Sequence, residues 1–184
     1  MRYQVSLKFI QKWMGALPVI FGAFIGSAEA LTCHNGLLPN NPNEVYVDHG
    51  NGTVTDTRTG LMWKKCAEGL SGATCIGTAQ LYNWPGAFNQ AESSTFAGHA
   101  DWRLPNIKEL SSLIEECRSQ PAINNIVFPN TPYKYGDAST TFLTSSPSSL
   151  FQDFAWAVNF LNGSGLSTGF RNAGFHIRLV RDSR

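Results

Sequence analysis

The sequence carries little charge and no clear excess of either sign. Charged residues make up 15% of the 184 residues, below the quarter that is typical of soluble domains. The formal net charge is only +1, so the chain has no overall field that would attract nucleic acid. Hydrophobic residues still account for 42% of the chain, which excludes intrinsic disorder. We therefore expect one globular domain without a nucleic-acid partner.

The N-terminus lacks an apolar run long enough to span a membrane. The uncharged stretch over residues 14–25 would extend about 18 Å as a helix, against about 30 Å for the hydrocarbon core of a bilayer. Basic residues precede this stretch, and Ala28-Glu29-Ala30 follows it with small residues at the positions that signal peptidase reads. We predict a signal peptide over residues 1–30, cleaved after Ala30, and a single domain over residues 31–184. The expected location is the periplasm, the cell surface or the medium, with no membrane span after cleavage.

Metal-binding patterns are also missing. No Cys-x-x-Cys pair is present, and the four histidines do not fall at ligand spacing, so a zinc site is the less favoured reading and we expect no metal. The expected domain contains four cysteines, and an even number in an exported protein predicts disulfides. Three pairings are possible. We favour Cys66 with Cys75, which bracket a glycine-rich segment able to fold back, and Cys33 with Cys117, which would tie the N-terminal arm to the domain.

Common catalytic motifs are absent as well. The sequence contains no Gly-x-Ser-x-Gly turn, no His-Glu-x-x-His helix and no phosphate-binding loop. Glu115 and Glu116 are adjacent on a predicted helix and therefore point in different directions, which disfavours a catalytic carboxylate pair. Arg103 lies between apolar residues, and we expect it to form a buried ion pair with Asp101 or Glu109. We expect neither enzymatic activity nor a cofactor.

Turn residues and apolar periodicity predict strands at both ends of the domain and helices between them. Gly50-Asn51-Gly52 is a tight hairpin signal, because glycine accepts the positive φ that such turns need. Asn83 and Asn106 are predicted N-caps, the second with Glu109 as its capping-box partner. In the last two strands large apolar residues alternate with other residues, which predicts one core-facing side. The predicted strands cover residues 45–48, 53–56, 61–64, 141–144, 155–160 and 175–181, and the predicted helices cover 84–91 and 107–117.

Four motifs in this order resemble the bacterial DUF1566 family, which includes the Lcl C-terminal domain of a collagen-like adhesin of Legionella. They are NGTVTD at residues 51–56, TGLMW at 59–63, DWRLPNIKEL at 101–110 and IRLVR at 177–181. The resemblance covers about residues 44 to 181 and implies a C-type-lectin-like α+β fold. In that fold two helices pack against small, mostly antiparallel sheets, and the N- and C-terminal strands are adjacent. The collagen-like repeats are absent here, so trimerisation is not implied.

The resemblance implies an exported, adhesin-like, non-enzymatic domain that binds a polysaccharide, including sulfated or other anionic ones, or a protein at the cell surface. A structural or assembly subunit of an extracellular complex is an alternative, because exposed edge strands are templates for association. Arg103-Leu104-Pro105 before a Glu-bearing helix also looks like the formylglycine-generating enzymes. Those oxidoreductases use cysteines near the C-terminus, whereas the last cysteine here is Cys117. The Glu-Pro-Asn or Gln-Pro-Asp loop of C-type lectins proper is missing, so calcium-dependent sugar binding is not expected.

Charge is unevenly distributed along the expected domain. Residues 31–153 have a net charge of −4, whereas residues 154–184 hold four arginines against one acid. Arginine matches the geometry of sulfate and carboxylate groups, so this end is a candidate surface for an anionic polysaccharide as well as an ordinary solvated strand. The tentative ligand-binding residues are Arg171 and, in an irregular segment, Tyr133 and Tyr135, for which packing in the core is the alternative.

Overall fold

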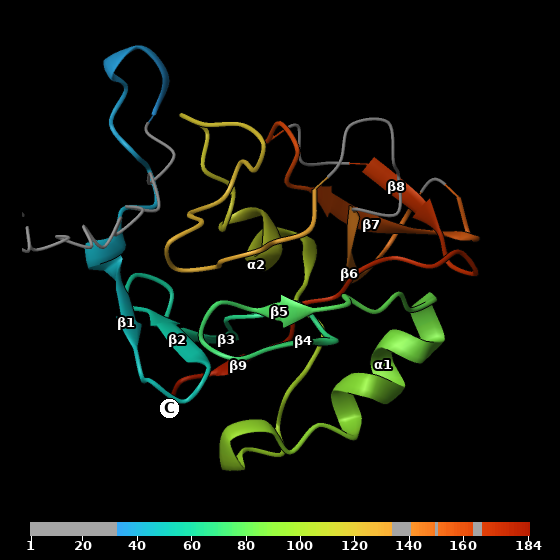
Figure 1. Cartoon of the computed structure of the whole chain (residues 1–184). Coiled ribbons are helices and arrows are strands. Elements are labelled where there is room, and N and C mark those ends of the chain that lie inside the picture. Colours follow the sequence, from blue (N-terminus) through green and yellow to red (C-terminus); the bar gives the residue numbers. More distant parts are fainter. Residues whose placement is uncertain (1–32, 134–140, 150, 164–166) are drawn as a thin grey trace, which may run out of the picture.

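Figure 1 shows a computed structural model of the chain, which describes residues 33–133, 141–149, 151–163 and 167–184. The expected signal peptide and Tyr135 lie outside the described residues. Within those ranges no helix is long and apolar enough to cross a membrane.

The first sheet joins the two ends of the described chain. It consists of β1 (Tyr46–Asp48), β2 (Thr53–Asp56), β3 (Leu61–Lys64) and β9 (Val180–Asp182), in the order β1-β2-β3-β9 with every pairing antiparallel. The predicted hairpin turn is present, with positive φ at Gly50 and Gly52. The N-terminal hairpin and the C-terminal strand therefore lie in one sheet, as the resemblance implied.

The second sheet lies on the opposite side of the molecule (Figure 1). It has the antiparallel order β6-β7-β8, with β6 at Thr141–Pro147, β7 at Phe154–Asn159 and β8 at Ser167–Phe170. A short hairpin of two antiparallel strands, β4 (Leu70–Ser71) and β5 (Ile76–Gly77), comes between the two larger sheets in the chain order. The sequence pattern did not predict β4, β5 or β8, which are short strands in glycine- and serine-rich segments.

Both helices begin where their caps predicted. α1 spans Trp84–Glu92 and the Asn83 side chain accepts a hydrogen bond from Gly86 N, while α2 begins at Ile107 with the capping box of Asn106 and Glu109 in place. The described residues also contain three short 3-10 helices: η1 (His34–Gly36), η2 (Asn43–Val45) and η3 (Phe96–Gly98). α2 packs against β6 and β7, and α1 packs against β6.

The predicted extension of the second helix to Cys117 is wrong, because α2 ends at Ser111. The hydroxyl of Ser112 donates to the carbonyl of Glu109 at 2.7 Å, and such side-chain bonds compete with helical ones. The backbone N–H of Glu115 then donates to Ala122 O at 3.0 Å, so the chain is held by a neighbouring segment instead of its own helix.

The predicted strand over residues 175–181 is also mostly wrong. Isolated bridges form at Phe175 and His176, and a regular strand begins only at Val180. The expected single core-facing side is absent too, since Ile177, Arg178 and Leu179 are all fully buried. The reason is tertiary: the segment runs from the second sheet to the first (Figure 1), so neighbouring elements cover both of its faces.

Two buried clusters form the core. One contains Trp63, Leu110 and Phe142, and the other contains Ala87, Leu143 and Ile177. Disulfides join Cys33 to Cys117 and Cys66 to Cys75, which is the favoured pairing. The described residues thus form an α+β domain with two α-helices, small antiparallel sheets and two disulfides.

Candidate functional site

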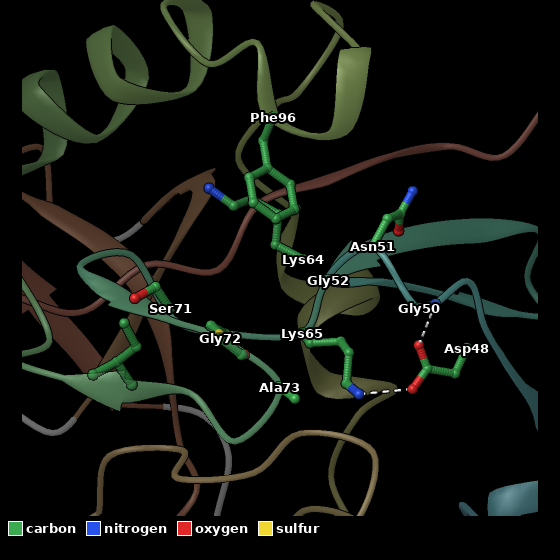
Figure 2. Close-up of a pocket in the computed structure, with 12 residues that line it drawn as sticks. Asp48, Gly50, Asn51, Gly52, Lys64, Lys65, Ser71, Gly72, Ala73 and Phe96 are labelled. Carbon is green, nitrogen blue, oxygen red and sulfur yellow. Dashed lines mark hydrogen bonds and ion pairs between the residues drawn. The ribbon is translucent and has the colours of Figure 1, made fainter.

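A cavity of about 670 Å³ separates the Gly50–Gly52 turn from the β4–β5 hairpin (Figure 2). Its volume falls in the range of small-ligand sites. Three parts of the chain supply its walls: the turn between β1 and β2, the end of β3 with the disulfide loop that follows it, and the ring of Phe96 from η3. The sequence predicted the turn and the disulfide loop as structural features, but it did not predict that they line a cavity.

The turn wall is fixed by side-chain hydrogen bonds to its own backbone. Asp48 Oδ1 accepts from Gly50 N at 2.9 Å, and Asn51 Oδ1 accepts from Thr53 N at 3.1 Å and from the Thr53 hydroxyl at 2.7 Å. Gly52 is required for two reasons. Its φ is +87°, and a Cβ there would stand 2.7 Å from the tip of the Phe96 ring.

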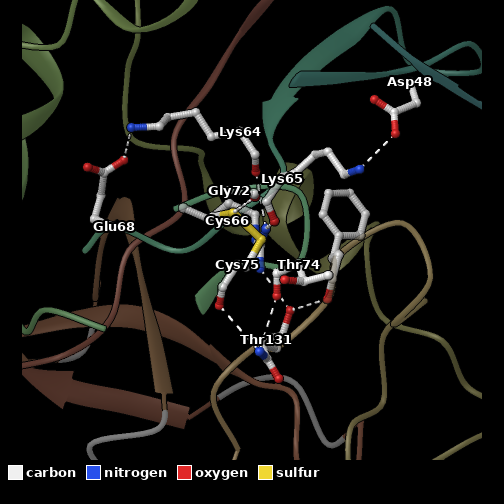
Figure 3. Close-up of a disulfide and its surroundings, with 12 residues drawn as sticks. Asp48, Lys64, Lys65, Cys66, Glu68, Gly72, Thr74, Cys75 and Thr131 are labelled. Atoms are coloured by element: carbon white, nitrogen blue, oxygen red, sulfur yellow. Dashed lines mark hydrogen bonds and ion pairs between the residues drawn. A yellow bond between two sulfur atoms is a disulfide. The ribbon is translucent and has the colours of Figure 1, made fainter. Parts of the chain in front are cut away.

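Each of the two lysines that line the cavity has a carboxylate partner (Figure 3). Lys65 Nζ lies 2.7 Å from Asp48 Oδ2, and this bond, together with the one from Gly50 N, lowers the pKa of the Asp48 carboxyl. Lys64 forms an ion pair with Glu68, and its ammonium lies 4.4 Å from the centroid of the Phe96 ring. The positive charges at the cavity are therefore balanced within the site.

The loop wall is held by the Cys66–Cys75 disulfide (Figure 3). Cys75 has a φ of +53°, in the left-handed region that a side chain rarely adopts. Asn130 Nδ2 donates to the carbonyls of Thr74 at 3.1 Å and Cys75 at 3.4 Å, which anchors the loop to a distant segment. The loop is thus fixed at both of its ends.

Arg178 supports the β3 side of the site from inside the core. Its guanidinium donates to the carbonyls of Lys64, at 3.1 Å, and Lys65, and it donates to the Thr131 hydroxyl at 2.8 Å. It also lies over the ring of Phe128, at 4.8 Å. Burial lowers the pKa of Arg178 to about 9, so the group remains a cation at neutral pH.

The basic surface expected at the C-terminal end is wrong for two of its four arginines. Arg178 is fully buried, and Arg181 is 8% exposed and forms an ion pair with Asp101 at 2.7 Å. The predicted ion pair of Arg103 is formed with Glu109 through two bonds of 2.8 Å, although the Arg103 side chain is 41% exposed, not buried in the core. Arg103 and Arg181 therefore each form an ion pair within the domain.

The predicted ligand residues do not line the main cavity. Tyr133 is exposed and lines a second hollow of about 410 Å³, which shares Leu70 with the main cavity. The guanidinium of Arg171 lies 4.3 Å from the centroid of the Trp84 ring, and its Nε donates to Phe154 O at 3.1 Å. Arg171 lines neither the main cavity nor the hollow at Tyr133.

A family model described as the Lcl C-terminal domain matches residues 52–181. The chain belongs to the Lcl C-terminal domain family. The match includes the disulfide loop, both lysines and Phe96, whereas Asp48 and Asn51 precede it. No curated protein and no solved structure matches this Lcl C-terminal domain. Its family and its two disulfides fit an extracellular location.

Proposed function

We propose that this Lcl C-terminal domain is an exported, non-enzymatic binding module that recognises a polysaccharide at the cell surface, with a surface protein as the alternative partner. The observation that supports this most is the cavity, which combines an aromatic ring, paired charges and rigid walls. Sugars are bound by such combinations of an apolar face and polar groups in fixed positions. The adhesin within the family favours the same class of function.

The chemistry of the cavity favours binding over catalysis. Asp48 has a lowered pKa and remains ionised, which is opposite to the raised pKa that a carboxyl needs as a general acid near neutral pH. Cys66 is in a disulfide and offers no thiol nucleophile. The formylglycine-type reaction would need two cysteines near the C-terminus, which the sequence lacks.

Tyr133 extends this proposed surface, because its hollow adjoins the disulfide loop through Leu70. Arg171 is a separate candidate contact, and its stacking on Trp84 presents a flat cationic group next to an aromatic ring. Tyr135, the third ligand-binding residue predicted from the sequence, lies outside the described residues and stays a prediction.

An assembly subunit is the second candidate function. Phe151 and Phe170 are 59% and 56% exposed, and the Phe170 ring lies 4.2 Å from that of Phe154. Phe170 belongs to β8, which is an edge of the three-stranded sheet. Exposed apolar residues at a sheet edge favour association with another chain.

A glycan array tests the proposal. The protein, produced with both disulfides intact, is applied in low salt to neutral and sulfated polysaccharides, and size-exclusion chromatography is run in parallel. We expect a monomer that binds at least one polymer. Lack of binding to every polymer would contradict the polysaccharide form of the proposal, and concentration-dependent polymers of the protein would favour the assembly role.

A further inference from the structure

We propose that the cavity selects an uncharged sugar residue, held between the Phe96 ring and the Asp48–Lys65 ion pair, over a sulfated or carboxylated one. This inference rests on the proposed function and specifies its substrate class. It differs from the expectation based on the C-terminal arginines, two of which the structure shows to be buried.

Exposure decides which charge a ligand meets. The Asp48 side chain is 52% exposed, whereas the side chains of Lys64 and Lys65 are only 12% and 13% exposed. A ligand therefore meets carboxylate oxygens, which accept hydrogen bonds, more than it meets ammonium groups. Sugar hydroxyls can donate to those oxygens, but a sulfate group has no proton to donate and is repelled by Asp48.

The charge of each lysine is already compensated. A sulfate that paired with Lys65 would lie beside the Asp48 carboxylate, 2.7 Å from Nζ, and one that paired with Lys64 would lie beside the buried carboxylate of Glu68, so each would be repelled by a negative charge. Separating Lys64 from Glu68 would leave a buried charge without its partner, which is costly. The cavity thus lacks the uncompensated positive charge that binding of a polyanion requires.

Phe96 supplies the apolar face for a sugar ring. It is 37% exposed and lines the cavity, and Trp102 Nε1 holds its segment by donating to Phe96 O at 2.9 Å. The faces of aromatic rings are electron-rich and attract the weakly positive C–H groups of a sugar. Lys64 over the ring keeps it in position.

Two donors at the rim complete the site. Asn51 and Ser71 line the cavity, and neither Asn51 Nδ2 nor the Ser71 hydroxyl has a hydrogen-bond partner among the described residues. Because Thr53 holds the Asn51 carboxamide by its oxygen, the NH₂ group is kept available as a donor. Donors and acceptors are therefore both present, as hydroxyl recognition requires.

Matched neutral and charged polymers test the inference. Binding of the protein to dextran, mannan, galactan and chitin oligosaccharides is measured beside dextran sulfate and the sulfated form of any polymer that binds. We expect a neutral polymer to bind at least about tenfold more tightly than its sulfated form. Its affinity should change by less than about threefold between about 0.05 and 0.5 M NaCl, since screening weakens only exposed charge interactions.

Variants then locate the binding. Ala73→Trp fills the cavity from an exposed position, and Gln152→Trp adds the same side chain at an exposed position outside the cavity lining. We expect the first to weaken neutral-polymer binding at least about tenfold and the second to change it less than about twofold. Asp48→Asn should weaken neutral binding and strengthen binding to dextran sulfate, because it releases Lys65. Thermal unfolding of each variant confirms that it folds.

The outcomes separate the inference from the proposed function. Preference for a sulfated polymer, with binding lost in high salt, overturns the inference and leaves the proposed function intact. Neutral binding that Ala73→Trp does not weaken overturns it as well, because recognition then lies elsewhere, for example at Phe170. Absence of binding to all neutral polymers also overturns it, and absence of binding to every polymer contradicts the proposed function too.

Discussion

Arg178 is the residue whose role is most unlike its expected one. It is fully buried, and its guanidinium joins the carbonyls after β3 to Thr131 and lies over Phe128. No carboxylate among the described residues is within ion-pair distance of it. The carbonyl and hydroxyl groups around it accept hydrogen bonds from its two terminal nitrogens, and such bonds are stronger when the donor is ionised, whereas its Nε has no partner among the described residues.

Removing this side chain should destabilise the protein severely. We expect Arg178→Ala to lower the free energy of unfolding by about 3 kcal/mol or more. The substitution leaves the bonded carbonyls without a donor, and it leaves a cavity where the buried side chain was. Urea unfolding followed by tryptophan fluorescence measures the loss. Arg184→Ala is the control, since Arg184 is exposed and its change should stay within about 0.5 kcal/mol. Equal effects of the two substitutions would contradict the structural role of Arg178.

Two glycines of one turn give a second prediction at the scale of single residues. Gly50 and Gly52 both have positive φ, but a Cβ at Gly50 meets nothing within 4 Å, whereas one at Gly52 would collide with Phe96. We expect Gly50→Ala to cost about 1 kcal/mol through backbone strain alone, and Gly52→Ala to cost more. Comparison of the urea midpoints of the two variants tests this. A smaller loss of stability for Gly52→Ala than for Gly50→Ala would show that Phe96 does not pack against Gly52.

The disulfide hairpin is the element that shapes one wall of the cavity. β4 and β5 contribute only two residues each, too few to be stable alone. The Cys66–Cys75 bond and the anchoring hydrogen bonds of Asn130 compensate for this. Cys66 and Cys75 are only nine residues apart in the sequence, which is why the sequence alone favoured this pairing.

We expect the Cys66→Ser, Cys75→Ser double variant to lose about 2 to 3 kcal/mol of stability, the chain-entropy value for a short loop. The melting temperature under oxidising conditions, compared with that of the intact protein, is the measurement. The domain should still fold, because its two core clusters do not depend on this bond. An unchanged melting temperature would show that the disulfide has no structural role.

At the scale of the whole molecule, charges act mainly by pairing, and this determines how stability responds to pH. Hydrogen bonds from Lys65 lower the pKa of Asp48, and those from Arg181 lower the pKa of Asp101. Burial by itself would raise the pKa of Glu109, but the bonds from Arg103 and Asn106 N outweigh it, so this pKa is lowered as well.

A carboxyl with a lowered pKa stabilises the folded state while it is ionised. Between the folded and the unfolded pKa the unfolded chain binds more protons, so the free energy of unfolding should fall as the pH falls below about 4.5 and should be nearly flat above pH 5. Urea unfolding between about pH 7 and pH 3 measures this dependence. Glu109→Gln removes the least exposed of these carboxylates, so in this variant the free energy of unfolding should fall less steeply as the pH is lowered. Stability that did not change down to pH 3 would contradict the prediction.

The sequence by itself determined the features that depend on neighbouring residues. The Gly50–Gly52 turn, the caps at Asn83 and Asn106, and the Cys66–Cys75 pairing all follow from local backbone preferences or short loops. The family motifs are short runs of neighbouring residues as well, so their order indicated the family without knowledge of distant contacts.

Only the tertiary structure decided the features that depend on what covers a segment. Alternation predicted one buried face near the C-terminus, but side chains on both faces are buried there, Arg178 among them. The second helix ends at Ser111, and Glu115 N beyond it donates to Ala122 O of the segment that follows instead of continuing the helix. The cavity arises where the turn, the disulfide loop and Phe96 meet, and no local preference encodes that meeting, because burial and contact are properties of the packed chain.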